Sequence, residues 1–332
     1  MFAELRIGKH DRGNGMALTS IEPAELAACG CDGYGRLDAI LEERLRQVEL
    51  VAVDMDGTLL GDDKRVSRAS RAAICRALDA GVRVVPASGR VTSILPKELF
   101  GIEGIRYAVC CAGASVQQLG TDPSDCKSLH ETGFTPDGAA GVVQMLKDRF
   151  GADIYIDVAC AGQVYTAREE LDLLPGFDLT GISLPFTLST CRVMPNLIEG
   201  IRSLPGEIGH VNIFGRTDAL LHEVMAWLKQ STPYELANSL QHNVEINAPG
   251  TSKWNGLIWL CEHLGVRPDR IMALGDGAND LDMVHHAWMG VAMRNGIAEL
   301  KEQAAAVTCY TNEEDGVARV LDDMVRIKRE VG

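Results

Sequence analysis

The chain has 332 residues, 46% of them hydrophobic, so it can bury a large core and is long enough for two domains. Its formal net charge is −14, which argues against nucleic-acid binding because such proteins usually carry a basic patch. The sequence has no apolar stretch of the roughly 18 residues that mark a membrane helix, and its N terminus lacks the apolar segment of a secretion signal, so we expect neither a membrane span nor export.

The ten cysteines are scattered along the chain, and none forms a CxxC pair or a Cys/His ladder. We therefore expect no zinc site. Most of the cysteines lie in apolar runs, where Cys behaves as a small buried hydrophobe. A reduced, cytoplasmic location is the expectation that follows.

Residues 1–47 begin with a polar, Gly-rich stretch. From Leu37 to Val48, apolar residues recur with helical spacing, which predicts a helix whose apolar stripe must pack against something. Two partners are open: the protein's own core or a second subunit.

Residues 51–60, VAVDMDGTLL, place Asp54 and Asp56 at the end of an apolar, β-branched run. Side chains two residues apart on a strand point to the same side, so these carboxylates can share one cation, or one can attack while the other moves protons. Two ionised carboxylates this close repel each other, so we expect a divalent cation or a basic neighbour. The alternative is a structural turn in which Asp caps the next helix.

Further polar residues follow other apolar runs. A helix over Ser67–Ala80 and a strand over Val82–Ala87 lead to Ser88-Gly89-Arg90, which offers a hydroxyl, a flexible backbone and a guanidinium. A lone triplet of this kind is most often only a turn.

Two more groups come late in the chain. Lys253 begins an amphipathic helix, and the apolar strand Ile271–Gly275 runs directly into residues 276–280, DGAND. A lone Lys is usually a solvated surface residue, so the order of the four groups, three of them directly after apolar strands, is what indicates a site.

The spacing of these groups predicts an inserted domain. About 165 residues separate Ser88 from Lys253, and a helix from Ile94 and a strand over 107–111 account for few of them. The rest contains helical patterns at 136–150 and 218–230, and strand-like runs at 153–158, 163–166, 210–214 and 244–246.

With these motifs in this order, the sequence resembles the haloacid dehalogenase superfamily of phosphohydrolases, and within it the Cof-like hydrolases with a type II (IIB) cap. The resemblance covers about residues 48–325, and its most specific stretches are DMDGTLL, GDGANDLDM and NEEDGVARVL. It implies an α/β fold: a Rossmann-like, three-layer core with a parallel sheet and an inserted α+β cap domain. The expected boundaries are an N-terminal extension at 1–47, a core at 48–113 and 247–332, and a cap at 114–246.

Residue chemistry and the resemblance suggest the same roles for the two motif aspartates. Phosphate fits the four groups best, because a transferring phosphoryl group needs positive charge and hydrogen-bond donors around its oxygens. Asp54 is the expected nucleophile and a Mg²⁺ ligand. Asp56 is the expected general acid and base, and the resemblance implies that its backbone carbonyl binds the metal.

The remaining roles follow from the resemblance in the same way. Ser88, Gly89 and Asn279 would bind phosphate, and Lys253 would steady both nucleophile and phosphate. Asp276 and Asp280 would complete the Mg²⁺ site. Capping of the helix that begins there is an alternative role for Asn279 and Asp280 that does not exclude the first. Arg90 is a candidate substrate contact.

Two departures from the family pattern bear on substrate choice. Similar proteins usually read Asn-Gly-Ala where this chain reads Ala112-Gly113-Ala114, and Met-Gly-Asn-Ala where it reads residues 293–296, MRNG. A contact from an Asn side chain is therefore absent, and Arg294 adds a bulky cation.

The expected function is a Mg²⁺-dependent phosphatase that hydrolyses small phosphomonoesters, such as sugar phosphates, through an aspartyl phosphate. The alternatives are a phosphomutase or phosphotransferase that uses the same aspartate, and a non-catalytic protein that binds phosphorylated metabolites. The expected partner is a small phosphorylated metabolite, with no nucleic acid and no membrane; oligomeric state is open. Candidate specificity residues, each of which is more commonly a plain surface or turn residue, are Arg168, His210, Asn212, Arg216 and His242.

Overall fold

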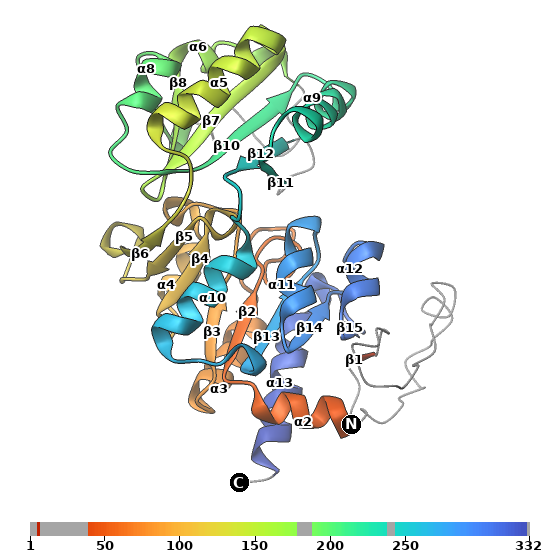
Figure 1. Ribbon diagram of the computed structural model, residues 1–332. Helices are drawn as coiled ribbons and strands as arrows, with labels where there is room; N and C mark the ends of the chain where they lie inside the picture. Colours follow the sequence, from red (N-terminus) through yellow and green to blue (C-terminus); the bar gives the residue numbers. More distant parts are fainter. Residues whose placement is uncertain (1–4, 7–38, 178–187, 238–242, 331–332) are drawn as a thin grey trace. The chain divides into compact units, whose positions relative to one another are not determined.

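The computed structural model describes residues 5–6, 39–177, 188–237 and 243–330 (Figure 1). The chain divides into two compact units. The first unit comprises Met1–Ala87, Pro96–Tyr107 and Leu257–Gly332, and the second comprises Ser88–Leu95 and Ala108–Gly256. The predicted boundaries, with an N-terminal extension at 1–47, a core at 48–113 and 247–332 and a cap at 114–246, stay a prediction.

The first unit contains a sheet of six described strands in the order β1–β15–β14–β13–β2–β3. All neighbours pair in parallel except β1, which is antiparallel to β15. Strands β2, β13 and β14 are buried along their whole length, and their sequences are almost continuously apolar, as is typical of parallel strands covered on both faces. The strands are β1 (Leu5–Arg6), β2 (Leu50–Val53), β3 (Arg83–Pro86), β13 (Ile271–Gly275), β14 (Met289–Ala292) and β15 (Ala306–Thr308).

Helices α2 (Ala39–Gln47), α3 (Arg68–Asp79) and α13 (Gly316–Arg329) pack together in this unit. Helix α2 also contacts β14, and Leu45 and Val48 are fully buried. The described part of the predicted stripe, from Leu41 to Val48, thus packs in the protein's own core, which was the first of the two alternatives, whereas Leu37 lies outside the described residues. The other helices with residues in this unit are α4 (Lys97–Phe100), α10 (Lys253–Leu264), α11 (Leu281–His286) and α12 (Ala298–Gln303).

The segment after β3 differs in detail from the expectation. Only the short α4 and a single turn at Thr92–Ile94 form where a helix from Ile94 was expected. Pro96 explains this, because proline disfavours helical backbone at the residue before it and lacks an N–H. The strand expected over 107–111 forms β4 (Tyr107–Cys110), which pairs in a three-stranded sheet with β5 (Ser115–Gln118) and β6 (Lys127–Glu131).

The second unit contains another sheet of six described strands, in the order β11–β12–β10–β7–β8–β9. All its pairs are antiparallel except β8 with β9. The strands are β7 (Ile154–Cys160), β8 (Gln163–Ala167), β9 (Cys191–Met194), β10 (Ile208–Gly215), β11 (Glu235–Ala237) and β12 (Asn243–Asn247). The predicted strands and helices of this region all appear, with ends shifted by at most two residues.

One face of this sheet packs against helices α5 (Pro136–Phe150), α8 (Leu197–Arg202) and α9 (Asp218–Ser231) (Figure 1). Alternate strand residues such as Val158, Val211 and Val244 form a core with these helices. The intervening residues must point to the opposite face. Near one end of that face, Tyr155 and Phe214 pack with Leu171 of the short α6 (Arg168–Leu171).

None of the helices in the described ranges is long and apolar enough to cross a membrane.

The fold is mixed α/β, with a parallel sheet in one unit and a mainly antiparallel sheet in the other, as the sequence predicts.

Candidate active site

Three carboxylates from two adjacent strands meet in the first unit. The register pairs Val53 with Leu274, and the Asp54 amide donates a 3.0 Å hydrogen bond to the Leu274 carbonyl, so Asp54 and Asp276 leave the sheet at the same edge. Asp280 follows one turn later. One carboxylate oxygen from each of these three residues lies within 4.8 Å of the others, and Asp54 and Asp280 are buried.

Hydrogen bonds fix the orientation of two of these carboxylates. The Thr58 hydroxyl donates to Oδ1 of Asp276 at 2.7 Å. The backbone amides of Asp276 and Gly277 both donate to Oδ2 of Asp280 at 3.0 Å. The Asp280 carboxylate therefore caps the start of the short turn Ala278–Asp280 that precedes α11, and it also contributes to the carboxylate group.

Gly57 makes room for this group. Its φ is +82°, and a Cβ on it would lie 2.3 Å from Oδ2 of Asp276. No other residue fits there without displacing the carboxylate. The Gly57 carbonyl accepts a 2.7 Å bond from Asn295, so the loop after β2 is tied to the loop after β14.

Asp56 is placed differently from the other predicted metal residues. Its carboxylate forms a 3.0 Å ion pair with Lys64 and does not belong to the group of three. The predicted metal contact of Asp56 was through its backbone carbonyl, and that contact stays a prediction.

Sequence reasoning missed several residues that support the loop after β2: Thr58, Lys64, Asn295 and Asn312. Asn312 donates to the Leu60 carbonyl at 2.9 Å, and its amide N–H donates to Asn295 at 3.2 Å. Thr58, Asn295 and Asn312 lie in the motif stretches 54–60, 293–296 and 312–321, but nothing in their spacing indicated a partner.

The predicted phosphate-binding residues Ser88 and Lys253 lie in the second unit, where both are held by one short segment. Ser88 is buried, and its carbonyl accepts a 3.0 Å bond from the Ala112 amide. Gly113 has a φ of +104°, and a Cβ on it would lie 1.8 Å from the Ser252 carbonyl oxygen and 2.9 Å from the Lys253 nitrogen. Lys253 itself is only 1% exposed at the start of α10.

The other predicted ligand contacts have local partners. The Arg90 amide donates to Oγ of Ser88 at 3.1 Å, and its guanidinium donates to the Ile94 carbonyl at 3.1 Å. Gly89 is buried, and Asn279 is partly buried in the turn Ala278–Asp280. Their roles toward phosphate or substrate stay predictions.

The two departures from the family pattern have clear local consequences. Cys111 and Ala112 both have a φ of +51°, which non-glycine residues other than Asn and Asp seldom adopt. Replacing Asn with Ala at 112 therefore removes a residue suited to this backbone. Arg294 contacts the Cys309 carbonyl at 3.2 Å and Glu314 at 3.5 Å.

The group formed by Asp54, Asp276 and Asp280 fits a hard divalent cation. Its donors are all carboxylate oxygens, the ligands that Mg²⁺ and Ca²⁺ prefer, and three close carboxylates repel one another unless positive charge offsets them. Gly57 leaves space beside Asp276 that a side chain would fill. We therefore identify these residues as the candidate metal centre.

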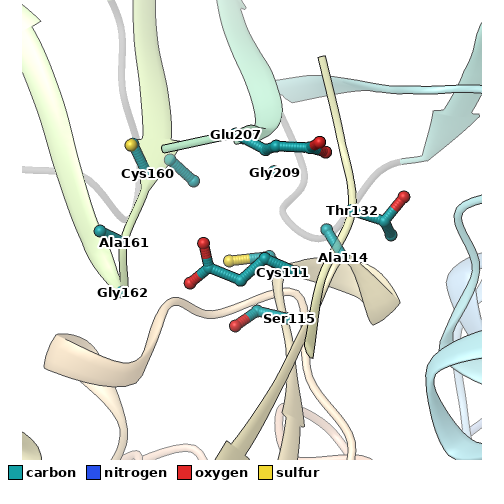
Figure 2. Close-up of a pocket in the computed structure, with 11 residues that line it drawn as sticks. Cys111, Ala114, Ser115, Thr132, Cys160, Ala161, Gly162, Glu207 and Gly209 are labelled. Atoms are coloured by element: carbon teal, nitrogen blue, oxygen red, sulfur yellow. The ribbon is translucent and has the colours of Figure 1, made fainter. Parts of the chain in front are cut away.

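A small cavity in the second unit has room for about one water molecule and is lined by Cys111, Cys160 and Gly209, among others (Figure 2). Burial raises the pKa of both thiols, so neither is a thiolate at neutral pH. The eight cysteines within the described ranges form no disulfide bonds.

Comparison with known proteins identifies the family. The family model described as haloacid dehalogenase-like hydrolase matches residues 51–321. The 5-amino-6-(5-phospho-D-ribitylamino)uracil phosphatase YcsE of Bacillus subtilis is 28% identical over 82% of this chain and 94% of its own length. The chloroplastic endoribonuclease YBEY of Arabidopsis thaliana is 31% identical over 81% of this chain, but the match spans only 45% of that longer protein.

Solved structures agree. A haloacid dehalogenase-like hydrolase from B. subtilis is 25% identical with a TM-score of 0.68, covering 83% of this chain and 99% of that one. A subclass IIB sugar phosphatase, at 18% identity and a TM-score of 0.66 over 83% and 98% of the two chains, shares the fold. The chain thus belongs to the haloacid dehalogenase-like hydrolase family, and it is an enzyme of that family's phosphatase type.

Proposed function

We propose that the protein is a Mg²⁺-dependent phosphatase that hydrolyses small phosphomonoesters through an aspartyl phosphate on Asp54. The observation that carries the proposal is the group of Asp54, Asp276 and Asp280 at the carboxyl ends of β2 and β13. Open parallel sheets bind ligands at this edge, and the chain belongs to a hydrolase family.

The proposed reaction has two displacements. A carboxylate oxygen of Asp54 attacks phosphorus, the bond from phosphorus to the ester oxygen breaks, and Asp56 gives its proton to the leaving alcohol. Asp56 then takes a proton from a water molecule, which attacks the aspartyl phosphate, releases inorganic phosphate and restores Asp54. A Mg²⁺ ion held by Asp54, Asp276 and Asp280 would offset the negative charge of carboxylate and phosphate.

The phosphate oxygens need hydrogen-bond donors throughout both steps. The resemblance assigns this role to Ser88, Gly89, Asn279 and Lys253. The structure supports this role for Ser88 and Lys253, because residues 111–113 contact both Ser88 and the start of α10. The Ser88 hydroxyl and the Lys253 ammonium group would then be preorganised rather than mobile.

Several relatives, among them YcsE, are named as phosphatases of 5-amino-6-(5-phospho-D-ribitylamino)uracil. We include this compound, with sugar phosphates, among the candidate substrates. The test is phosphate release from a panel of phosphorylated metabolites by purified protein with Mg²⁺. Release from at least one of them, abolished by Asp54→Asn, supports the proposal. No release from any compound, including the activated ester p-nitrophenyl phosphate, rejects it.

A phosphomutase or phosphotransferase would use the same aspartates. Incubation with one sugar monophosphate separates the classes, because a phosphatase releases inorganic phosphate while a mutase returns the phosphoryl group to another position of the sugar. The alternative of a non-catalytic binding protein predicts phosphate-ester binding without turnover.

A further inference from the structure

The first unit contains a groove that has no part in the candidate active site. Its volume is about 460 Å³, and it is lined by the C-terminal ends of α3 and α10, by β3 and by the residues just before β4. Ligand pockets in proteins commonly measure roughly 300–1,000 Å³, so this groove has room for a small organic molecule. We call it the β3 groove.

The β3 groove follows the outer edge of the parallel sheet. Strand β3 is the last described strand of that sheet, and the four consecutive residues Val82–Val85 all line the groove. Side chains alternate between the two faces of a strand, so a groove that touches four residues in a row runs along the strand edge. The Arg83 amide donates to the Glu49 carbonyl on the β2 side, so the Val84 amide faces away from β2 and toward the groove.

The groove lies at the opposite end of the strands from the carboxylates. Arg83 begins β3 and pairs with Leu50 at the start of the parallel strand β2, whereas Asp54 follows the far end of β2. Four residues of strand separate Leu50 from Asp54, which is about 13 Å. A ligand in the groove therefore differs from a substrate that reacts at Asp54.

The charge of the groove is unusual for this protein. Two guanidinium groups, those of Arg83 and Arg106, line it, and no carboxylate does. Both side chains are exposed, and neither forms an ion pair or a side-chain hydrogen bond with any residue in the described part of the chain. Other arginines of this unit do pair, for example Arg65 with Glu98. In a chain of net charge −14, two arginines without a carboxylate partner form a local site that attracts anions.

The rest of the lining is apolar. Leu78, Tyr107 and Leu264 are each only partly buried, so they leave apolar surface that a ligand can cover. A guanidinium group binds a carboxylate or a phosphate through two parallel hydrogen bonds, and it also stacks on flat rings. A bare inorganic ion would satisfy the arginines but would leave the apolar wall exposed. The lining thus fits a molecule with an anionic group and a flat, apolar body.

We propose that the β3 groove is a second ligand site, which binds a small organic anion made of an aromatic or apolar body and one phosphate or carboxylate group. Arg83 and Arg106 hold the anionic group, and Leu78, Tyr107 and Leu264 contact the body. The proposal does not depend on the proposed function, because binding in this groove needs neither the metal nor Asp54.

The test compares three probes with the same ring system: 1-naphthylphosphonate, 1-naphthoate and the neutral 1-naphthalenemethanol. The phosphonate imitates a phosphate ester but has a P–C bond, so the enzyme cannot hydrolyse it as a phosphoester. Each probe is titrated into the full-length protein in excess chelator, and its Kd is measured by calorimetry. We expect at least one of the two anions to bind at least about tenfold more tightly than the alcohol, and the tighter anion identifies the acidic group.

Two variants locate the binding. Arg83→Gln and Arg106→Gln each remove one charge and keep a long polar side chain, and both positions are exposed, so we expect the melting temperature to stay the same. Each change should weaken binding of the anion at least about fivefold and leave the Kd of the alcohol within twofold of wild type. Arg68→Gln is the matched control, because Arg68 is also exposed but lies at the start of α3 and does not line the groove.

Activity separates this site from the active site. The KM for p-nitrophenyl phosphate should stay within about twofold of wild type in both groove variants, since the groove and Asp54 lie at opposite ends of the strands. A rise in KM that parallels the loss of anion binding would show that these arginines act on the substrate, and it would overturn the proposal.

Three further outcomes overturn it. The first is that neither anion binds more tightly than the alcohol. The second is that Arg68→Gln weakens binding as much as the two groove variants. The third is that inorganic phosphate binds as tightly as the better naphthyl anion, which would mean that the groove attracts any anion and recognises no organic body. Absence of phosphatase activity changes none of these readouts, so failure of the proposed function is seen separately.

Discussion

At the scale of single residues, the chemistry depends on how Asp54, Asp276 and Asp280 are held close together. Their carboxylates repel one another, and the fold offsets this with backbone amides at Asp280 and the Thr58 hydroxyl at Asp276. Such supporting bonds orient ligands before the metal arrives. Removing the nucleophile and removing a support should therefore have different effects.

Asp54→Asn should abolish turnover while the protein stays folded. The change keeps the shape of a buried side chain at a strand end but removes the charged nucleophile. We expect the rate of p-nitrophenyl phosphate hydrolysis to fall at least about a thousandfold, the scale seen when a covalent route is lost. A rate within tenfold of wild type, on homogeneous protein with a native circular dichroism spectrum, would reject Asp54 as the nucleophile.

Thr58→Val should weaken Mg²⁺ binding more than it slows the chemical step. The substitution keeps the volume of a side chain that is 1% exposed but removes the 2.7 Å bond to Asp276. Loss of such a bond typically weakens metal binding about 10- to 100-fold, so activity should recover at high Mg²⁺. Thr166→Val, which also removes a buried hydroxyl bond, should leave the Mg²⁺ titration unchanged. Equal titration curves for Thr58→Val and wild type would contradict the support role.

Asp157 should make the protein less stable as the pH rises. Burial raises its pKa from 3.8 to about 7, and groups that contribute to its titration include Tyr155, Glu170 and Glu245. Between about pH 4 and pH 7 the unfolded chain loses a proton that the folded chain keeps, so this group's stability contribution is complete at low pH and is lost as the pH rises to 7. The loss amounts to roughly 4 kcal/mol at most, because each pKa unit is worth about 1.4 kcal/mol.

Asp157→Asn removes this titration. The variant should gain free energy of unfolding relative to wild type between pH 5 and pH 8, as measured by urea denaturation at both values. A difference between the two proteins that is independent of pH would show that Asp157 does not titrate in this range.

At the scale of secondary-structure elements, the turn that joins β4 to β5 organises the second unit. Residues 111–113 have three successive positive φ angles and hold both Ser88 and the start of α10. Gly113 lies so close to the Ser252 carbonyl that there is no room for a side chain. This turn therefore positions two of the predicted phosphate ligands.

Gly113→Ala should lower the free energy of unfolding by at least about 2 kcal/mol, because the new Cβ collides with backbone atoms and alanine disfavours a φ of +104°. Activity should fall with it, since the start of α10 carries Lys253. Gly141→Ala, in the exposed part of α5 with no atom near the new Cβ, should instead stabilise the protein by about 0.5–1 kcal/mol. Thermal denaturation of both variants checks the pair.

At the scale of the whole molecule, the net charge of −14 makes a local cation essential for a dianionic substrate. Mg²⁺ should raise the melting temperature as well as the rate, because it relieves the repulsion among three carboxylates. When the free Mg²⁺ concentration is about 100 times the Kd, binding adds about 2.7 kcal/mol to the free energy of unfolding.

Ca²⁺ should raise the melting temperature but not support turnover. It binds carboxylates with more and longer bonds than Mg²⁺ and distorts the in-line geometry. Asp54→Asn should be more stable than wild type in excess chelator, since one repelling charge is gone. Full activity in chelator, or equal rates with Ca²⁺ and Mg²⁺, would refute the metal role.

The family, the parallel sheet and the order of the chemical groups could be predicted without the structure, because they follow from local patterns in the sequence. Continuous apolar runs predict buried parallel strands, and Asp54 and Asp276 follow such runs directly. The helix at α5 agrees to the residue, since Thr135 caps it and Gly151 ends it.

Contacts between residues far apart in the sequence became apparent only in the folded chain. The fold brings together positions whose spacing in the sequence carries no pattern: Lys64 with Asp56, Thr58 with Asp276, and the row of Asp157, Asn212 and Glu245 across β7, β10 and β12. Residues such as His210 and Asn212 are more commonly found on the surface or in turns, but strand alternation and strand pairing bury both. Contacts of this kind depend on register and burial, which are properties of the packed sheet and not of any one segment.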